Sequence, residues 1–377
     1  MAINLRSPHY VGGNILVDGY NVYKIFIYET TRPATPTYTI RKGYNANYNA
    51  GNIEVSELIR DYLDTSFGQD YESQCIKVYI EYEVYDSSGD VDTEGDYGLD
   101  FAFDSYSYFE ETNFSVDNSP LMISNREIFG LADNFVRIPI NTKYDPTVTF
   151  FNKGVIVGTE SFTGDEVVAN QIKYITLVGE SDSDSFIDRI ALEGDTYEPN
   201  DCIVAFLDEY EIGEVDEIRV SDSNSGLETV KVKVLEECKY EPKKVTFINK
   251  FGALQDMYFF KKSVEMMNVE KESYKSNILN SSGGYNRSSH VNRNFNVVGK
   301  ESVTLSSGFL NEEYNEVFKQ MMLSEKVWVT TIVDGVRQVL PINVKTSDIT
   351  YKTSLNDKLV EYTIEFDKSY DTINNIR

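Results

Sequence analysis

Side chains that could carry catalysis are few in this chain, and they form no familiar catalytic pattern. The two histidines, His9 and His290, both stand in polar, loop-like stretches, where an imidazole is ordinarily exposed to solvent. The sequence has no GxSxG, HExxH or P-loop motif. Acidic pairs are too numerous to single out a glycosidase dyad, which is defined by the distance between two carboxyl groups. We therefore expect no enzymatic activity and no cofactor.

One acidic segment, DVDTEGDYGLD, has part of the spacing of a calcium-binding loop. It places Asp90, Asp92 and Glu94 at the first, third and fifth loop positions, with Gly95 at the sixth. The twelfth position is Phe101, where an EF-hand needs a bidentate glutamate, and no helix is expected on either side. We favour a solvated acidic turn and keep Asp90, Asp92 and Glu94 as a weak calcium candidate.

The charge of the chain limits its partners. The sequence has 35 Lys and Arg against 61 Asp and Glu, a formal net charge of −26. Sequence-independent binding to nucleic acid depends on cationic neutralisation of phosphates, which this charge opposes. The chain also has no basic helix and no aromatic ribonucleoprotein-type motif, so we expect no specific nucleic-acid binding. The surplus of carboxylates fits repulsion of a passing polyanion, as in a DNA conduit, or acidic patches that meet basic neighbours.

The cysteines and the N-terminus bear on the compartment in which the protein is made. Cys75, Cys202 and Cys238 are widely spaced and no CxxC occurs, which indicates neither a zinc site nor a disulfide framework. The opening MAINLRSPHYVGGN lacks the apolar stretch of a signal peptide, and no run of 18 apolar residues exists. We expect synthesis in the cytoplasm and no membrane insertion.

The first 142 residues predict a β-sandwich domain. The segment 75–85, CIKVYIEYEVY, alternates between apolar and polar side chains, which is typical of a strand with one buried and one wet face. Two prolines in 30–40 predict a loop leading into an edge strand. A short helix is expected over 56–63, with Ser56 as its N-cap.

Residues 143–240 repeat this style and predict a second sandwich, immunoglobulin-like or fibronectin-like. The turns between its short strands are acidic and rich in Ser and Gly. The expected strands are VTFFNKGVIVG, QIKYITLVG, FIDRIALEG, DCIVAFLD, DEIRVSD and ETVKVKVLEE.

Residues 241–377 predict a split β-barrel-like domain with one helix. The helix is expected over 311–324, NEEYNEVFKQMMLS, where acidic residues follow a capping Asn311 and an apolar stripe recurs at helical spacing. Asp334-Gly335 predicts the turn of a hairpin. An extended polar loop is expected over 275–295.

An aromatic, lysine-flanked stretch, KKVTFINKFGALQDMYFFKK, opens this third domain. We interpret it as two core strands, and prefer core packing to a ligand pocket because aromatic stripes are usually core. The lysines are expected at wet edges or against an acidic neighbour. One face of the first strand carries Val245, Phe247, Asn249 and Phe251; the second strand places Met257 and Phe259 opposite Tyr258 and Phe260.

The loop SSGGYNRSSH and its flank are the candidate interaction site. Tyr285, Arg287, His290 and Arg293 lie there, in a chain that is short of arginine. Such a segment suits an arm that becomes ordered on an acidic neighbour. The alternative is a polar loop that is merely mobile.

Several segments taken together resemble virion proteins of tailed bacteriophages that infect Bacteroidota and marine bacteria. They are SPHYV, YKIFIYE, TYTIRKGY, EVSELIRDYL, ECKYEPKKVTFINKFGALQDMYFFKK, LSSGFLNEEYNEVFKQMMLSEKVWV and the C-terminal residues from LPINVKTSD to the end. The resemblance covers most of the chain and is strongest at its ends. It implies a structural protein of the virion tail, in the baseplate, tail tip or an adaptor ring, with other tail proteins and copies of itself as partners. No catalytic residue is carried over.

The order of elements in the third domain is similar to the split-barrel module of tail tube and hub proteins, in which a long loop reaches the neighbouring subunit. Residues 275–295 would take that role. Two other functions stay open: a receptor- or carbohydrate-binding tail module, and, less favoured, a polysaccharide-degrading tail enzyme. Carbohydrate sites usually expose Trp, and the single Trp328 stands in an apolar strand.

Overall fold

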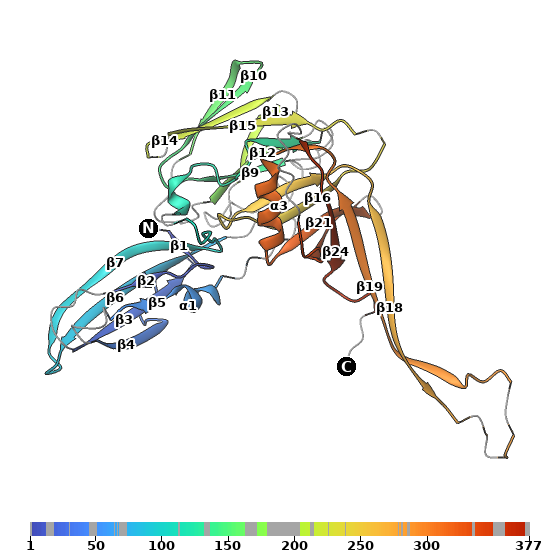
Figure 1. Ribbon diagram of the computed structural model, residues 1–377. Coiled ribbons are helices and arrows are strands. Elements are labelled where there is room, and N and C mark those ends of the chain that lie inside the picture. Colours follow the sequence, from blue (N-terminus) through green and yellow to red (C-terminus); the bar gives the residue numbers. More distant parts are fainter. Residues whose placement is uncertain are drawn as a thin grey trace, which may run out of the picture. The chain divides into compact units, whose positions relative to one another are not determined.

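The structure, a computed structural model, is mainly β, as the composition predicts (Figure 1). It describes the chain except for residues 1, 13–18, 30, 45–50, 64, 66, 68–73, 112–113, 132–135, 163–171, 179–203, 212–214, 225, 238, 278, 280–281, 285–286, 334–335, 350–358 and 374–377. Within that description no helix is long and apolar enough to cross a bilayer. The chain forms two compact units. Unit 1 comprises Met1–Glu236, Thr246–Met257 and Glu316–Ser324; unit 2 comprises Glu237–Val245, Tyr258–Asn315 and Glu325–Arg377.

The first sheet of unit 1 has the strand order β1-β7-β6-β3-β4. Its strands are β1 (Ile3–Asn4), β3 (Gly19–Tyr28), β4 (Tyr38–Tyr44), β6 (Cys75–Asp86) and β7 (Val91–Phe103). The same part of the chain also forms a separate two-stranded sheet from β2 (Tyr10–Val11) and β5 (Ile53–Glu54). The alternation predicted for β6 is confirmed, because Ile76, Val78 and Ile80 lie in the core. Lys77 is an exception on the opposite face, since it too is buried. Strand β4 is an edge strand, as predicted.

The short helix α1 spans Ser56–Arg60, so the helix expected over 56–63 ends three residues early. Ser56 is its first residue and not its N-cap. The cap is supplied by Glu54, whose Oε1 accepts from the Ser56 amide at 2.7 Å. A carboxylate at this end is favoured by the positive end of the helix dipole.

Two further sheets of unit 1 share one core. The five-stranded sheet has the order β11-β10-β14-β15-β8 and the three-stranded sheet the order β13-β12-β9. The strands are β8 (Glu127–Gly130), β9 (Val136–Asn141), β10 (Thr147–Asn152), β11 (Val155–Ser161), β12 (Ile172–Val178), β13 (Val204–Glu211), β14 (Glu217–Asp222) and β15 (Gly226–Val234). A 3-10 turn, η1, spans Val116–Asn118. The expected strand at 186–194 lies outside the described residues.

Strand pairing corrects the boundary expected after residue 142. Strand β8 pairs in parallel with β15, and β9 pairs antiparallel with β12. Leu121 and Ile138 lie in the same core cluster as Val148 and Val230. This core therefore begins before the expected boundary, because strands from both sides of it bury their apolar faces together.

The β10–β11 hairpin closes with a two-residue turn between the paired residues Asn152 and Val155. Both turn residues have positive φ, 49° at Lys153 and 80° at Gly154. Hairpin turns of this kind favour Asn or Gly, because other L-residues are strained at positive φ. We expect Lys153→Asn to raise the free energy of unfolding by about 0.5–1 kcal/mol, measured by urea denaturation. Lys239→Asn, at an exposed lysine without positive φ, is the control and should give no gain. A Lys153→Asn protein no more stable than wild type would contradict the turn assignment.

The third large sheet has seven strands in the order β17-β16-β21-β22-β24-β19-β18. They are β16 (Lys243–Ile248), β17 (Leu254–Phe259), β18 (Val264–Lys275), β19 (Asn292–Ser306), β21 (Val327–Val333), β22 (Val336–Val344) and β24 (Thr363–Lys368); a small pair joins β20 (Leu310–Asn311) and β23 (Leu359–Val360). One sheet of the structure is curled into a half-barrel. The hairpin β21–β22 is confirmed, while its Asp334-Gly335 turn lies outside the described residues.

The aromatic stretch at β16 and β17 is core, as predicted. Phe247 and Phe259 are fully buried, and Tyr258 and Phe260, expected on the opposite face, are buried too. The expectation that its lysines mark wet edges is wrong for Lys244 and Lys250, which are both buried. Helix α3 spans Tyr314–Leu323, so the predicted helix begins three residues later than expected, and its stripe residues Tyr314, Val317, Phe318 and Met321 are buried.

Candidate interaction site on the β18–β19 arm

Strands β18 and β19 form a long antiparallel ribbon that leaves the seven-stranded sheet (Figure 1). Their pairing runs from Val264 opposite Thr304 to Lys275 opposite Asn292. Strand β19 pairs with β24 only over Ser302–Ser306. Residues 268–300, which we call the outer arm, thus project beyond the last pairing with β24. The expected loop over 275–295 is shorter than predicted, since β18 continues to Lys275 and β19 resumes at Asn292.

A bulge divides the outer arm. Glu270 faces Val298 and Glu272 faces Phe295, so Lys271 stands opposite two residues of β19. One of these is Asn296, with φ of 52°, a left-handed conformation that asparagine tolerates better than most residues. A bulge bends a ribbon and increases its twist, so the outer arm does not simply extend the plane of the sheet.

The arm exposes apolar side chains along its whole length. Every residue of β18 is exposed. The exposed large apolar residues of the arm are Val264, Met266, Met267, Val269, Tyr274, Leu279 and Phe295. A two-stranded ribbon is marginally stable in water by itself, and contiguous exposed apolar surface is typical of an interaction site. The arm therefore has the properties of a segment that another surface covers.

The distal part of the outer arm concentrates aromatic and charged groups on one face. In the strand register Tyr274 faces Arg293, and Glu272 faces Phe295. The rings of Tyr274 and Phe295 lie edge to face with centroids 5.7 Å apart. Opposed residues share a face of a ribbon, so these four side chains form one surface, which we call the aromatic face. Tyr274 and Phe295 were missed in the sequence, although ESYK and NRNF carry aromatics at positions that meet.

The four residues predicted to interact are placed differently by the structure. Arg293 belongs to the aromatic face. Arg287 and His290 are exposed in the connecting segment, and Tyr285 lies outside the described residues. His290 contributes through its backbone, because its carbonyl accepts from the Ser276 hydroxyl at 3.2 Å and from Arg293 Nε at 3.4 Å. The other histidine, His9, is half-buried, which departs from expectation, and burial lowers the pKa of its imidazole.

The outer arm is cationic in an acidic protein. Residues 268–300 contain five basic and two acidic residues, whereas the whole chain has a net charge of −26. The basic residues are Lys271, Lys275, Arg287, Arg293 and Lys300. A positively charged element on a negatively charged protein favours an acidic partner surface.

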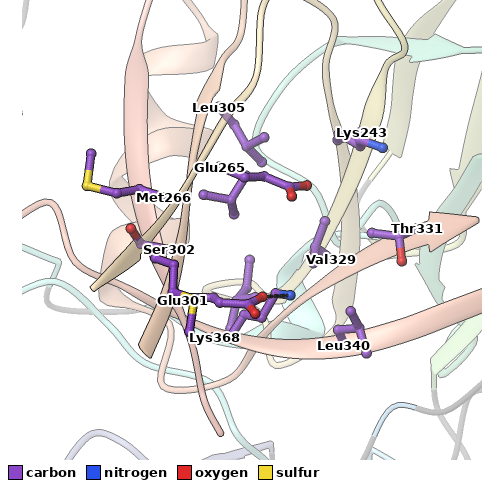
Figure 2. Close-up of a pocket in the computed structure, with 13 residues that line it drawn as sticks. Lys243, Glu265, Met266, Glu301, Ser302, Leu305, Val329, Thr331, Leu340 and Lys368 are labelled. Atoms are coloured by element: carbon purple, nitrogen blue, oxygen red, sulfur yellow. Dashed lines mark hydrogen bonds and ion pairs between the residues drawn. The ribbon is translucent and has the colours of Figure 1, made fainter. Parts of the chain in front are cut away.

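A hollow of about 480 Å³ lies at the base of the arm, on the seven-stranded sheet (Figure 2). Glu265, Met266 and Glu301 of the arm form one wall, and Val329 and Leu340 lie across from them. All of its lining residues come from strands β16, β18, β19, β21, β22 and β24. The base of the arm is therefore anchored beside a largely apolar depression.

Two carboxylates face this hollow, which is the arrangement that an acid–base site would need. Glu301 forms an ion pair with Lys368 (Figure 2). The hydrogen bond from Lys368 holds the pKa of the Glu301 carboxyl below its ordinary value, and the same bond raises the pKa of Lys368. A general acid needs the opposite shift, so Glu301 has the chemistry of a structural ion pair.

The weak calcium candidate does not form a loop. Asp92 and Glu94 belong to strand β7, and Asp90 directly precedes it. The turn lies earlier, where Asp86 Oδ1 accepts from the amides of Ser88 and Asp90 at 2.8 and 2.9 Å. Among the described residues no group of three or more His, Cys, Asp or Glu is placed to hold a metal ion.

Comparison with known proteins assigns no family: the sequence matches no protein-family model, and no curated protein matches it significantly.

Proposed function

We propose that this chain is a structural protein that works in a multi-subunit assembly and binds its neighbour through the outer arm. The observation that carries the proposal is the ribbon of residues 268–300, which exposes apolar and cationic side chains. Its two strands pair with each other and, among the described residues, with no third strand; near its base the Gly299 carbonyl accepts from the Thr372 amide at 2.8 Å. Burying one medium-sized apolar side chain contributes about 1.5–3 kcal/mol, so covering several of them offsets much of the entropic cost of association.

The assembly that the sequence resemblance implies is the tail of a bacteriophage, with the chain in a baseplate, tail-tip or adaptor ring. In this proposal the protein is made in the host cytoplasm and resides in the virion. The two sheet systems of unit 1 would be immunoglobulin-like or fibronectin-like sandwiches, and the seven-stranded sheet would be the split-barrel module. The half-barrel curl of one sheet and the long arm support this proposal.

Receptor or carbohydrate binding remains the second function. Nothing specific favours it, because Trp328, the residue best suited to stack on a sugar, is only 8% exposed in β21. A polysaccharide-degrading activity has no more support, since the Glu301 carboxyl is paired with Lys368.

Shortening the arm tests the proposal. Glu270 and Val298 face each other across the ribbon, so residues 271–297 can be replaced by a two-residue Asn-Gly turn without changing the register at the base. We expect the full chain to form oligomers in sedimentation velocity experiments and the shortened chain to be monomeric, with an unchanged circular dichroism spectrum.

The matched control removes apolar surface elsewhere. Ile156→Ser, at an exposed position of β11, should leave the oligomers intact. A full chain that stays monomeric, or a shortened chain that associates like the full one, would contradict the proposal.

A further inference from the structure

We infer that the surface that receives the outer arm is the acidic β6–β7 hairpin of a second copy of this chain. The inference rests on the proposed function and names the partner surface. We call residues 81–100 of strands β6 and β7 the acidic hairpin.

The acidic hairpin lies in the longest stretch of the chain without a basic residue. No Lys or Arg occurs between Lys77 and Arg126. The hairpin itself carries eight acidic residues: Glu81, Glu83, Asp86, Asp90, Asp92, Glu94, Asp96 and Asp100. It therefore has the charge opposite to that of the outer arm.

The pairing within the hairpin sets like charges against each other. Glu83 faces Glu94, and Glu81 faces Asp96, in adjacent strands. Like charges that face each other across two strands destabilise a sheet, by about 0.2–1 kcal/mol per pair. An arriving cation relieves this repulsion, so a basic partner is favoured over water.

Two carboxylates of β6 are already neutralised by cations, whereas three of β7 accept at most neutral hydrogen bonds, such as that from the Gly98 amide to Asp96 Oδ1 at 2.9 Å. Lys24 forms an ion pair with Glu83, and Arg32 with Glu81. Asp92, Glu94 and Asp96 form no ion pair with any residue that the structure describes. Strand β7 thus presents a row of carboxylates that a basic ribbon can neutralise.

The acidic hairpin also matches the apolar character of the arm. Val91, Tyr97 and Leu99 of β7 are exposed among its carboxylates. The ring centroids of Tyr97 and Tyr82 lie 5.2 Å apart. On the arm, Tyr274 faces Arg293 across the ribbon, and the ring of Phe295 lies edge to face with that of Tyr274. Both surfaces therefore combine aromatic or aliphatic side chains with charges of opposite sign, the pattern of complementary interfaces.

The lengths of the two surfaces are comparable. Strand β18 of the outer arm runs from residue 268 to 275, and the exposed part of β7 from 91 to 99. At about 3.3 Å per residue each covers roughly 25–30 Å. Since arm and acceptor are different surfaces of one chain, one copy can bind a second through its arm while its hairpin receives a third. Head-to-tail contacts of this kind form a ring when the rotation between copies closes and an open filament when it does not.

Charge reversal on either surface of the full-length chain tests the inference. The arm variant carries Lys271→Glu, Lys275→Glu and Arg293→Glu; the hairpin variant carries Asp90→Lys, Asp92→Lys and Glu94→Lys. We expect each variant alone to weaken self-association at least about tenfold in sedimentation experiments, and an equimolar mixture of the two to associate within about threefold of wild type. Circular dichroism of each variant checks that it is folded.

The control matches the change in net charge of the hairpin variant, but at exposed acidic residues outside the hairpin: Glu160→Lys, Glu236→Lys and Glu312→Lys. It should associate like wild type. If the shortened arm abolishes association but the hairpin variant behaves like this control, the arm still makes the interface and the acceptor is another surface, which overturns only the present inference. If neither the shortened arm nor the hairpin variant alters association, the proposed function falls as well. Failure of the mixture to associate also overturns the assignment of the hairpin.

Discussion

Replacing Asn249 by alanine is expected to lower the free energy of unfolding of unit 1 by about 3–5 kcal/mol. The side chain is fully buried and all of its hydrogen-bonding groups are used. Its Nδ2 donates to the Met122 carbonyl at 2.6 Å and to Gln255 Oε1 at 3.1 Å. Its Oδ1 accepts from the amides of Phe251 and Ala253 at 2.9 and 3.2 Å.

The size of the effect follows from what alanine leaves behind. Two backbone amides, one carbonyl and one side-chain oxygen lose a partner inside the protein, and an unsatisfied buried polar group costs about 1–3 kcal/mol. Local rearrangement of Gln255, which also donates to Asn125 Oδ1 at 3.0 Å, recovers part of this loss.

Urea denaturation followed by circular dichroism measures the change. Asn294→Ala, at an exposed position of β19, is the control and should shift the free energy by less than about 0.5 kcal/mol. An Asn249→Ala protein as stable as this control would mean that water or a neighbour replaces the four bonds. Asn249→Asp, of the same shape, should be at least as damaging, because it turns a carboxylate oxygen towards the Met122 carbonyl.

Glu111→Gln is expected to destabilise the protein by about 2–3 kcal/mol at neutral pH, and Lys250→Met by less than about 1 kcal/mol. The two residues form an ion pair in which the side chain of Lys250 is only 8% exposed and that of Glu111 is 36% exposed. Removal of the carboxylate strands a buried ammonium, whereas removal of the ammonium leaves a carboxylate that water reaches.

Aromatic rings around Lys250 reduce the destabilisation expected for Glu111→Gln and explain why Lys250→Met should cost little. The ammonium of Lys250 lies 4.2 Å from the ring centroid of Phe114 and 4.6 Å from that of Tyr108. In Glu111→Gln these rings still stabilise the Lys250 ammonium, so the expected destabilisation is smaller than for a buried ion pair that has no such rings. Methionine at 250 packs its thioether against the same rings.

The pH dependence of the Glu111→Gln effect has a definite sign. Burial pushes the pKa of the Glu111 carboxyl up, but the hydrogen bonds from Lys250 and from the Tyr108 amide outweigh burial and hold the pKa below its ordinary value. A carboxyl with a lowered pKa contributes stability above its unfolded pKa, near 4.3, and loses it as the pH falls through the folded pKa. The difference between wild type and Glu111→Gln should therefore vanish at low pH. A difference that persists at pH values well below about 4 would contradict the role of the ion pair.

The arm shows why sequence patterns found only part of the candidate site. Arg293 was predicted because arginine is scarce, yet the beginning of the strand that carries it, β19, was expected to belong to a loop over 275–295. A ribbon exposed on both faces has no buried side, so its sequence lacks the alternation by which β6 was recognised. Tyr274 and Phe295 become one surface only through the strand register.

The acidic segment at 90–94 is a second case in which a local sequence pattern failed: it indicated a turn where the structure has the start of strand β7. Its spacing indicates a loop when it is considered alone, but its neighbour in space is β6, which holds the segment extended through backbone pairing. Lys250 was expected at a wet edge because its partner, Glu111, stands 139 residues away in the chain. Local patterns do not report partners at such distances.

By itself the sequence determined the β character, the acidic balance, the aromatic core strands β16 and β17, and the position of helix α3, because a face that is buried leaves a period in the order of its residues. Only the tertiary structure decided that β8 and β9 share a core with β12 and β15, that Lys77, Lys244 and Lys250 are buried, and that β18 and β19 form an arm. These features depend on which distant segments pair, and pairing is made by backbone groups that every residue except proline carries alike.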